Sequence, residues 1–248
     1  MSDIYLFDVD GTLVMDGIIP KSAIEAINRL KEKNNIVMLS TGRCLGQLKY
    51  VLEKIDFDGA ILNNGSIVVV RNEIIFKSPI NKSTIQQMIA DNLHLGLLTK
   101  DKYFAFNDDE VFEQFYDYFN IEKAITIKKD VPLEDVYSLG VYGLDLDQLD
   151  VTRYKDLKFI RVCPIGFDVV NKGISKASGI KFLRKKFPSS KIISFGDNYN
   201  DIEMLDQSDI SIVMGEANLE VQKHADYVTK SPLEDGIMYA LKKFVRSI

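Results

Sequence analysis

The sequence predicts an α/β fold in which a Rossmann-like parallel-sheet core carries an inserted α+β cap domain. Near both ends of the chain, short apolar strands alternate with amphipathic helices, which is the pattern of a parallel sheet. Between about residues 80 and 170, pairs of adjacent strands replace this alternation, as is typical of an antiparallel module. The 248 residues are enough for two domains. We therefore expect a discontinuous core, residues 1–79 and 171–248, and a cap, residues 80–170.

The N-terminal segment predicts a strand followed by a helix. The apolar run Ile4–Phe7 has the length of a buried central strand, and the chain turns at Gly11. Beyond Pro20, Ser22 and Glu25 have the spacing of a capping box, so we expect a helix to open there. Its apolar face is formed by Ile24, Ile27 and Leu30.

Two further core strands precede the insertion. The first, Ile36–Leu39, leads into a second helical stripe, and the second, residues 60–62, ends in the turn signal Asn64-Gly65. The second helical stripe consists of Leu45, Leu48, Val51 and Leu52. A hairpin is expected from the next two strands, Ile67–Val70 and Glu73–Phe76.

The inserted segment combines helices with pairs of strands. Helices are expected at residues 84–92 and 108–119, and strand pairs join residues 95–99 to 103–106 and residues 159–162 to 167–170. Aromatic stripes at helical spacing are more often packing than ligand platforms, so we expect most aromatic residues here to form the core of the cap. They are Tyr103, Phe104, Phe106, Phe112, Phe115, Tyr116, Tyr118 and Phe119.

From Lys172 onward, the alternation of helices and strands resumes. Helices are expected near residues 174–182, 201–205 and 236–244, and strands at residues 192–195 and 210–213. This segment is expected to complete the sheet that the N-terminal segment begins.

The composition weighs against several classes of protein. The net charge is −5 and the lysine clusters are spread along the chain, so we expect no nucleic-acid partner. No apolar run approaches the length of a membrane span, and no targeting segment is evident, so we expect a cytoplasmic protein without a membrane partner. Two cysteines and two histidines are too few for a disulfide framework or a zinc site. The oligomeric state is left between a monomer and a weak homodimer.

Polar side chains follow three of the predicted parallel strands. Asp8 and Asp10 follow the first, Ser40–Arg43 follow the second, and Gly196–Asp201 follow the strand at residues 192–195. Because the carboxyl ends of parallel strands share one edge of the sheet, we expect these groups to converge on one pocket. Paired carboxylates in such a pocket suggest phosphoryl transfer.

Four motifs of the expected core occur in a fixed order. They are Asp8-x-Asp10-Gly11-Thr12-Leu13, Ser40-Thr41-Gly42-Arg43, Gly173-Ile174-Ser175-Lys176 and Gly196-Asp197-x-x-Asn200-Asp201. Together they resemble the motifs of the haloacid dehalogenase (HAD) superfamily, and most closely its Cof-type sugar-phosphatase branch. The sequence departs from that pattern at Ala177 and Glu216, where glycine and asparagine are usual. The cap shows no comparable match, so the substrate is left open.

The resemblance implies a phosphatase in which a carboxylate attacks phosphorus. Asp8 is the expected nucleophile, and Asp10 would protonate the leaving alcohol and then take a proton from water. Two carboxylates would repel an anionic phosphate, so Mg²⁺ is the expected cofactor. Its expected ligands are Asp8, the backbone carbonyl of Asp10, and Asp197.

Further residues are expected around the transferred phosphoryl group, where negative charge needs fixed donors. The Thr41 hydroxyl and the backbone N–H groups of Thr41 and Gly42 are expected to donate to one phosphate oxygen. Lys176 would supply a positive charge that grips the phosphate and restrains Asp8.

Three remaining residues have less definite roles. Asp201 is expected beside the metal, steering a metal-bound water. Asn200 either contacts the phosphate or holds that carboxylate, and Arg43 either reaches the substrate or is solvated.

The expected function is that of a magnesium-dependent phosphatase, a phosphoric monoester hydrolase, that acts on small phosphorylated metabolites through an aspartyl-phosphate. Sugar phosphates are the first expectation, with the cap closing over the leaving group. A phosphomutase or a phosphonatase of the same superfamily is the alternative, and a phosphonatase would need a lysine reaching in from the cap. Outside the enzymes, a receiver-like phospho-aspartate signalling domain is a shorter α/β fold. Asp10 argues against it, because an acid/base beside the nucleophile hastens turnover.

Overall fold

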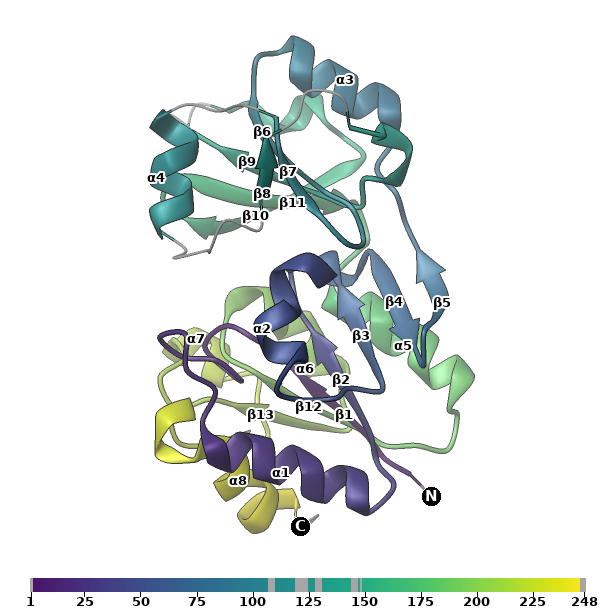
Figure 1. The fold of residues 1–248 in the computed structure, drawn as a ribbon, viewed down its shortest axis with the longest axis vertical. Helices are drawn as coiled ribbons and strands as arrows, with labels where there is room; N and C mark the ends of the chain where they lie inside the picture. Colours follow the sequence, from purple (N-terminus) through teal and green to yellow (C-terminus); the bar gives the residue numbers. More distant parts are fainter. Residues whose placement is uncertain are drawn as a thin grey trace.

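The chain forms two β-sheets, each with its own helices, stacked along the long axis of the molecule (Figure 1). A computed structural model describes residues 2–106, 110–118, 125–127, 131–143, 147 and 149–245. The larger sheet is built from both terminal parts of the chain, and the smaller from the part between them. The predicted fold class, a parallel-sheet core with an inserted α+β module, is therefore confirmed. We call the two modules the core and the cap.

The core sheet has eight strands in the order β14-β13-β12-β1-β2-β3-β4-β5. Strands β14 to β3 run parallel, and β4 and β5 add the expected antiparallel hairpin at one edge. The bounds are β1 (Ile4–Phe7), β2 (Ile36–Ser40), β3 (Gly59–Leu62), β4 (Ile67–Val70), β5 (Glu73–Lys77), β12 (Ile192–Gly196), β13 (Ile210–Val213) and β14 (Tyr227–Val228).

Helices cover both faces of this sheet. On one face, α1 and α8 pack with Tyr5 and Phe7 of β1, and on the other, α5 and α6 pack with Ile4 and Leu6. Because alternate side chains of a strand point to opposite faces, a strand covered on both sides is apolar throughout. The core helices are α1 (Lys21–Glu32), α2 (Lys49–Leu52), α5 (Lys176–Lys186), α6 (Ile202–Gln207), α7 (Leu219–Gln222) and α8 (Gly236–Ala240). Single turns lie at Leu45–Leu48, Asn63–Gly65, Tyr199–Asp201, Pro232–Glu234 and Leu241–Val245.

The cap sheet has six strands in the order β10-β11-β9-β6-β7-β8. One face packs on α3 through a cluster that includes Leu97 and Val141, and the other face carries a cluster that includes Tyr103 and Cys44 of the core. The cap elements are α3 (Lys82–Ala90), β6 (His94–Leu98), β7 (Tyr103–Ala105), α4 (Glu110–Tyr118), β8 (Ile125–Ile127), β9 (Ser138–Tyr142), β10 (Leu157–Cys163) and β11 (Gly166–Asn171), with single turns at Leu133–Asp135 and Val151–Arg153.

The cap contains two strands, β8 and β9, that are absent from its predicted elements. β9 was not predicted, yet it lies between β11 and β6 and joins the two expected strand pairs into one sheet. Of the aromatic residues, Tyr103, Phe104 and Phe112 are buried as expected. The ends of the expected helix, residues 108 and 119, lie outside the described residues, as do the side chains of Phe115, Tyr116, Tyr118 and Phe119.

The predicted capping box of the first helix is wrong. The helix begins at Lys21, with Pro20 at the N-cap position and no side chain capping it. Pro20 has extended backbone, and its carbonyl accepts the first helical hydrogen bond, from Ala23. Ser22 therefore lies inside the first turn rather than at the N-cap position, and its hydroxyl does not cap the helix.

The two crossings between core and cap are bonded to each other. The Asn171 Nδ2 at the end of β11 donates to the Ser78 Oγ at 2.9 Å and to the Pro79 carbonyl at 2.9 Å, just after β5. One side chain thus holds both connections, close to the expected boundaries at residues 79/80 and 170/171. Among the described residues, no helix has the length and apolar character needed to cross a bilayer.

Candidate active site

The candidate site lies where four neighbouring strands of the core sheet end. β12, β1, β2 and β3 are adjacent and parallel. Asp197, Asp8, Thr41 and Asn63 directly follow their last residues. The sheet therefore brings together at one edge the loops that sequence analysis singled out.

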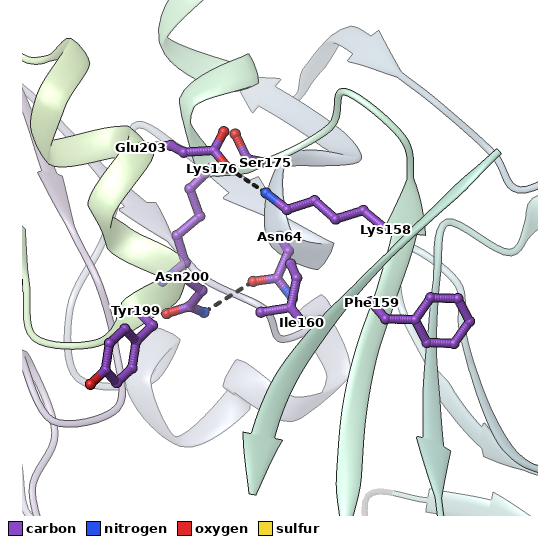
Figure 2. A pocket seen from close by; sticks show the side chains of 9 residues that line it. All are labelled: Asn64, Lys158, Phe159, Ile160, Ser175, Lys176, Tyr199, Asn200 and Glu203. Carbon is purple, nitrogen blue, oxygen red and sulfur yellow. Dashed lines mark hydrogen bonds and ion pairs between the residues drawn. The ribbon is translucent and has the colours of Figure 1, made fainter. Parts of the chain in front are cut away.

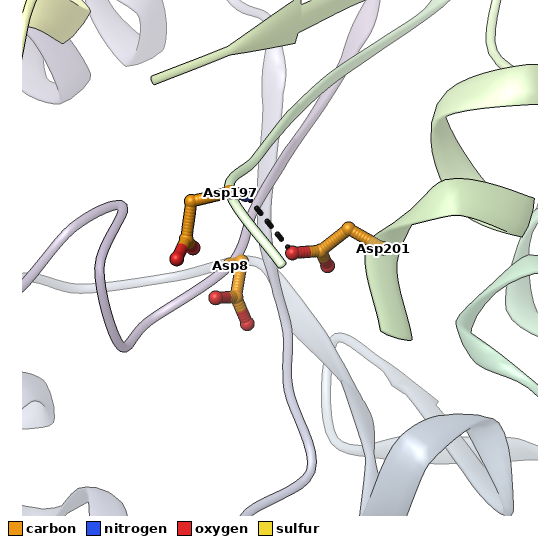
Figure 3. A group of neighbouring side chains, drawn as sticks. All are labelled: Asp8, Asp197 and Asp201. Atoms are coloured by element: carbon orange, nitrogen blue, oxygen red, sulfur yellow. Dashed lines mark hydrogen bonds between the residues drawn. The ribbon is translucent and has the colours of Figure 1, made fainter. Parts of the chain in front are cut away.

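Three carboxylates form the centre of the site. Asp8, Asp197 and Asp201 each place an oxygen within 4.8 Å of the other two (Figure 3). Asp8 is 5% exposed and Asp201 is fully buried. The backbone N–H of Asp8 donates to the Phe195 carbonyl at 3.0 Å, which fixes the first carboxylate against the neighbouring strand.

Lys176 is the buried cation of this cluster. It is the first residue of α5, and its Nζ lies 2.6 Å from the Asp8 Oδ1 and 2.7 Å from the Asp201 Oδ1. Burial alone would lower the pKa of Lys176, but the carboxylates of Asp201 and Asp8 outweigh it and raise that pKa above its ordinary value. The lysine is therefore charged, and it sets the orientation of both carboxylates.

Asp201 has both of its oxygens engaged by protein groups. While Oδ1 accepts from Lys176, Oδ2 accepts from the backbone N–H groups of Asp197 and Asn198, each at 3.1 Å. These contacts suit a residue that anchors Lys176 and shapes the loop after β12. They leave it less available to a metal than the other two carboxylates are.

Asp197 is held by the first motif. Its Oδ1 accepts from the Thr12 Oγ1 at 2.7 Å. Gly11 has φ +81°, and a Cβ there would lie 2.2 Å from the Asp197 Oδ2, so only glycine fits. The turn after β1 is thus shaped to admit the carboxylate that follows β12.

The donor set fits a hard divalent cation. Burial raises the pKa of Asp8 well above its usual range, against the opposing charge of Lys176. Burial, with the charge of Asp201 next, raises the pKa of Asp197 to about 7. Three carboxylates around one lysine leave an excess of negative charge, and carboxylate oxygens are the ligands that Mg²⁺ prefers. Asp8 and Asp197 are the two whose oxygens are best placed to bind it.

Asp10 and Arg43 form an ion pair at the rim of the site. The Arg43 Nε and Nη2 donate to the two oxygens of Asp10, both at 2.7 Å. Burial opposes the charge on Arg43, but its hydrogen bonds to the Asp10 carboxylate and the charge of that carboxylate outweigh this and raise the arginine pKa. The side chain of Asp10 is about half exposed and stands apart from the three clustered carboxylates. Arg43 is thus neither solvated nor free, because it holds the second aspartate of the motif.

Thr41 differs from expectation in one respect. Its backbone N–H donates to the Ile61 carbonyl at 2.9 Å and extends the β2–β3 ladder, so the expectation that this amide donates to phosphate is wrong. The Thr41 Oγ1 accepts from the backbone N–H of Arg43 at 3.1 Å. The hydroxyl proton of Thr41 remains available to a ligand oxygen.

A chain of polar side chains links the core loops to the cap. The Asn200 Nδ2 donates to the Asn64 Oδ1 at 3.1 Å, and the Asn64 Nδ2 donates to the Asp168 Oδ2 of β11 at 2.6 Å. Asn64 is 1% exposed and has φ +51°. Asn64-Gly65 was expected as a turn that fits the family resemblance, and Asn64 was not expected to be a site residue. The rule applied to the other three strand ends would have indicated the pair Asn63-Asn64, which follows β3.

A cavity of about 140 Å³ lies between core and cap (Figure 2). Lys176 and Asn200 are at its core side, and Lys158 and Ile160 of β10 are at its cap side. The Lys158 Nζ forms an ion pair with Glu203 of α6 across it. The cap residues of this wall were not predicted, because nothing in the sequence indicates which face of β10 meets the core. The lining residues are Asn64, Lys158, Phe159, Ile160, Ser175, Lys176, Tyr199, Asn200 and Glu203.

Comparison with known proteins gives consistent results. A profile of the haloacid dehalogenase-like hydrolases matches residues 5–241. The chain is 28% identical over 256 residues to the "Putative phosphatase YkrA" of Bacillus subtilis, covering 98% of this chain and 97% of that protein.

Two further proteins are similar to nearly the whole chain. The 5-amino-6-(5-phospho-D-ribitylamino)uracil phosphatase YcsE of Bacillus subtilis is 25% identical over 247 residues, covering 96% of this chain and 94% of that one. A solved HAD subclass IIB sugar phosphatase superposes with a TM-score of 0.87 at 29% identity, and the match covers 100% of both chains.

Proposed function

We propose that this chain, which belongs to the haloacid dehalogenase-like hydrolase family and is a phosphatase, hydrolyses small phosphorylated metabolites through a phosphorylated Asp8 with the help of Mg²⁺. Sugar phosphates and phosphorylated polyols are the substrates that we expect first. The relatives named above act on a phosphoribityl compound and on sugar phosphates, which share leaving groups rich in hydroxyls.

One observation carries the proposal. The Asp8 Oδ1 lies 2.6 Å from the Nζ of a buried lysine that is 168 residues away in the chain, and the carboxylate of Asp197 is beside it. A buried carboxylate fixed by a lysine and flanked by a second acid suits a nucleophile, because its direction of attack is set before the substrate arrives. A purely structural ion pair between Asp8 and Lys176 would not be stabilised by the additional carboxylate of Asp197.

Asp8 and Asp197 would hold the metal ion, together with the backbone carbonyl of Asp10. When bound, the ion supplies positive charge that lets the phosphate approach two carboxylates and that offsets charge developing on its oxygens. The same neutralisation keeps Asp8 ionised despite its burial, which the nucleophile requires.

The chemistry then runs in two half-reactions. The Asp8 carboxylate attacks phosphorus while the bond from phosphorus to the leaving oxygen breaks, and Asp10 delivers a proton to that oxygen. Water next attacks the phosphorus of the aspartyl-phosphate, Asp10 takes the proton from the water, and Asp8 is released. Arg43 holds Asp10 until the phosphate of the substrate competes for the guanidinium group.

Lys176 and Thr41 complete the phosphate site. The lysine offers positive charge to an equatorial phosphate oxygen, and the Thr41 hydroxyl donates to a second. Asn200 stays in contact with Asn64 and thus borders the site from the core side of the cavity.

A phosphonatase is the less favoured alternative. Lys158 does reach from the cap into the cavity, as that reaction would require, but it is ion-paired with Glu203. A lysine held by a carboxylate is protonated and is a poor nucleophile for imine formation. Product analysis in ¹⁸O-labelled water also separates hydrolysis from return of the phosphoryl group to an alcohol, as in a phosphomutase.

The test is a panel of phosphate monoesters assayed with Mg²⁺, for the natural sequence and for Asp8→Asn. We expect hydrolysis that falls by at least about 10⁴-fold in Asp8→Asn, as for other nucleophile substitutions. Asp56→Asn, at an aspartate whose side chain is 93% exposed, is the control and should leave the rates unchanged. Hydrolysis that survives Asp8→Asn would rule out the assigned nucleophile.

A further inference from the structure

We infer that Asp168 of the cap selects the substrate by accepting a hydrogen bond from a hydroxyl group on the leaving group. This inference rests on the proposed function and deepens it, since it assigns the recognition of the part of the substrate that the core does not contact. Tyr103, from β7, lies beside Asp168 and is the second residue of this subsite.

The register of the cap sheet fixes the direction of Asp168. Asp168 pairs with Gly140 of β9 and with Ile160 of β10, and Gly140 pairs with Gly96 of β6. Directly paired residues of neighbouring strands point to the same face of a sheet. Because Ile160 lines the cavity between core and cap, Asp168 is on the face that meets the core.

Contacts with the core place the carboxylate beside the phosphate-binding loop. The Asp168 Oδ2 accepts from the Asn64 Nδ2 at 2.6 Å. A Cβ on Gly42 would lie 3.1 Å from the same oxygen, so the carboxylate rests against the residue that follows Thr41. A group attached to a phosphate held by Thr41 and Lys176 would therefore be within reach of Asp168.

One oxygen of this carboxylate is available to a ligand. Among the described residues, the Asp168 Oδ1 has no hydrogen-bond partner, although Oδ2 is held by Asn64. Burial raises the pKa of Asp168 to about 6, and the hydrogen bond from Asn64 and the charge of Lys176 oppose the rise. The side chain is thus largely ionised at neutral pH. A partly desolvated carboxylate oxygen without a partner is costly, and a donor on the substrate would remove that cost.

Two glycines make room for Tyr103 next to this carboxylate. A Cβ on Gly96 would lie 2.1 Å from the Tyr103 Oη, and one on Gly140 would lie 2.9 Å from it. The phenol therefore lies across the strand that neighbours Asp168, with its oxygen over the residue paired with Asp168. The ring and hydroxyl of Tyr103, which is 3% exposed, give the subsite a rigid second wall.

The chemistry of the subsite favours a neutral donor. An ionised carboxylate accepts hydrogen bonds and repels a second anion, and an apolar leaving group would leave it unpaired. A hydroxyl satisfies it without a further charge in a site that already contains a buried lysine and that would also hold the proposed metal ion. An ammonium group is the other donor that the test must separate.

The test compares three esters of one chain length: ribitol 5-phosphate, pentyl phosphate and 5-aminopentyl phosphate, each with Mg²⁺. We expect the natural sequence to prefer ribitol 5-phosphate to pentyl phosphate. In Asp168→Asn, kcat/KM for ribitol 5-phosphate should fall by about 10- to 100-fold, mainly through KM, because a hydrogen bond to a charged group is lost. Pentyl phosphate should change by less than about threefold, since it makes no such bond.

Two further variants keep the result interpretable. Tyr103→Phe removes only the hydroxyl and should lower the ribitol preference to a smaller extent, by about threefold to tenfold. Asp156→Asn, at an exposed cap aspartate, should change nothing. Asparagine can still accept from Asn64, so the fold of Asp168→Asn should be retained, as thermal unfolding would verify.

Several outcomes would overturn the inference. An equal loss for ribitol and pentyl phosphate would mean that Asp168 acts only through the structure. A natural preference for 5-aminopentyl phosphate that disappears in Asp168→Asn would make the subsite an ammonium site. If the natural sequence hydrolysed none of the three esters, the proposed function would fail first, and the assignment of Asp168 with it.

Discussion

The two lysines that line the cavity differ in how the fold holds them. Lys176, from the core, is 1% exposed and lies between two buried carboxylates at 2.6 and 2.7 Å. Lys158, from the cap, is 36% exposed and pairs with Glu203, whose side chain is half exposed. A buried charge that loses its partner costs several kcal/mol, whereas a half-exposed pair contributes about 1 kcal/mol or less. The charged residues on the core side of the cavity are thus fixed in place. The Lys158–Glu203 pair on the cap side can be broken with little loss in the free energy of unfolding.

This contrast predicts that core changes abolish turnover and that cap changes adjust substrate affinity. The cavity supports this division, because about 140 Å³ is small for a metabolite, for which pockets of roughly 300 Å³ or more are usual. We therefore expect the cap to move when a substrate enters, while the core network keeps its geometry. Four experiments test this division between core and cap.

Removal of the metal should have the largest effect. With EDTA, we expect phosphatase activity to fall by at least about 10³-fold and to return with Mg²⁺. The pKa of Asp197 is about 7 in the metal-free fold, above its unfolded value near 3.8, so the folded state keeps a proton that the unfolded chain has released. The free energy of unfolding of the metal-free protein should therefore fall as pH rises from about 4 through 7.

The same linkage gives a control within the experiment. Mg²⁺ should raise the melting temperature more at pH 8 than at pH 5, because it binds the ionised carboxylates. An equal rise at both pH values, or activity that persists in EDTA, would contradict the assignment of the acidic cluster.

Lys176→Met should have the next largest effect. It leaves Asp8 and Asp201 buried without their cation, so we expect a loss of about 3–5 kcal/mol in the free energy of unfolding and of at least about 10²-fold in kcat. Urea unfolding and steady-state kinetics measure the two. Lys181→Met, at an exposed position of the same helix, is the control. If Lys176→Met were as stable as the natural sequence, the ion pairs of Lys176 with Asp8 and Asp201 would not stabilise the core.

Asn64→Gly tests the link between the two sides. Glycine accepts the φ of +51° without strain, so the variant removes only the bonds to Asn200 and Asp168. We expect kcat/KM to fall by about 10-fold, mainly through KM. Asn72→Gly, at φ +67° in the exposed β4–β5 turn, is a matched control. A fall in kcat alone would place Asn64 with the chemistry rather than with substrate recognition.

Lys158→Met should have the smallest effect. The lost pair with Glu203 is half exposed, so stability should change by about 1 kcal/mol or less, and kcat by less than about fivefold. Lys155→Met, at an exposed cap position, is the control. A loss of turnover as large as that of Lys176→Met would remove the distinction between the two sides.

Much of the fold follows from local patterns in the sequence. The apolar runs of β1, β2 and β12 could be predicted because strands covered on both faces are apolar throughout. β9 was not predicted because Gly140 interrupts its run of strand-forming residues. The reason for a glycine at this position is visible only in the folded cap, where it makes room for Tyr103. The predicted capping box was wrong although Ser22 and Glu25 have the right spacing, because the helix begins one residue after Pro20.

The candidate site was predictable where it follows the rule for strand ends. Asp8, Lys176 and Asp197 do lie together, as that rule and the resemblance indicated, while their catalytic roles stay predictions. The pairing of Arg43 with Asp10 and the hydrogen bond from the Thr41 amide to Ile61 were not predictable, because each joins segments that are separate in the sequence.

The class of the fold, the loops that meet at one sheet edge and the family of the chain could all be inferred from the amino-acid sequence. These are properties of strand periodicity and of short motifs, which act over a few residues. The contact of Asn64 with Asp168 and the ion pair of Lys158 with Glu203 across the cavity became visible only in the folded chain. Such contacts depend on how the core sheet and the cap sheet face each other, and no local pattern specifies that orientation.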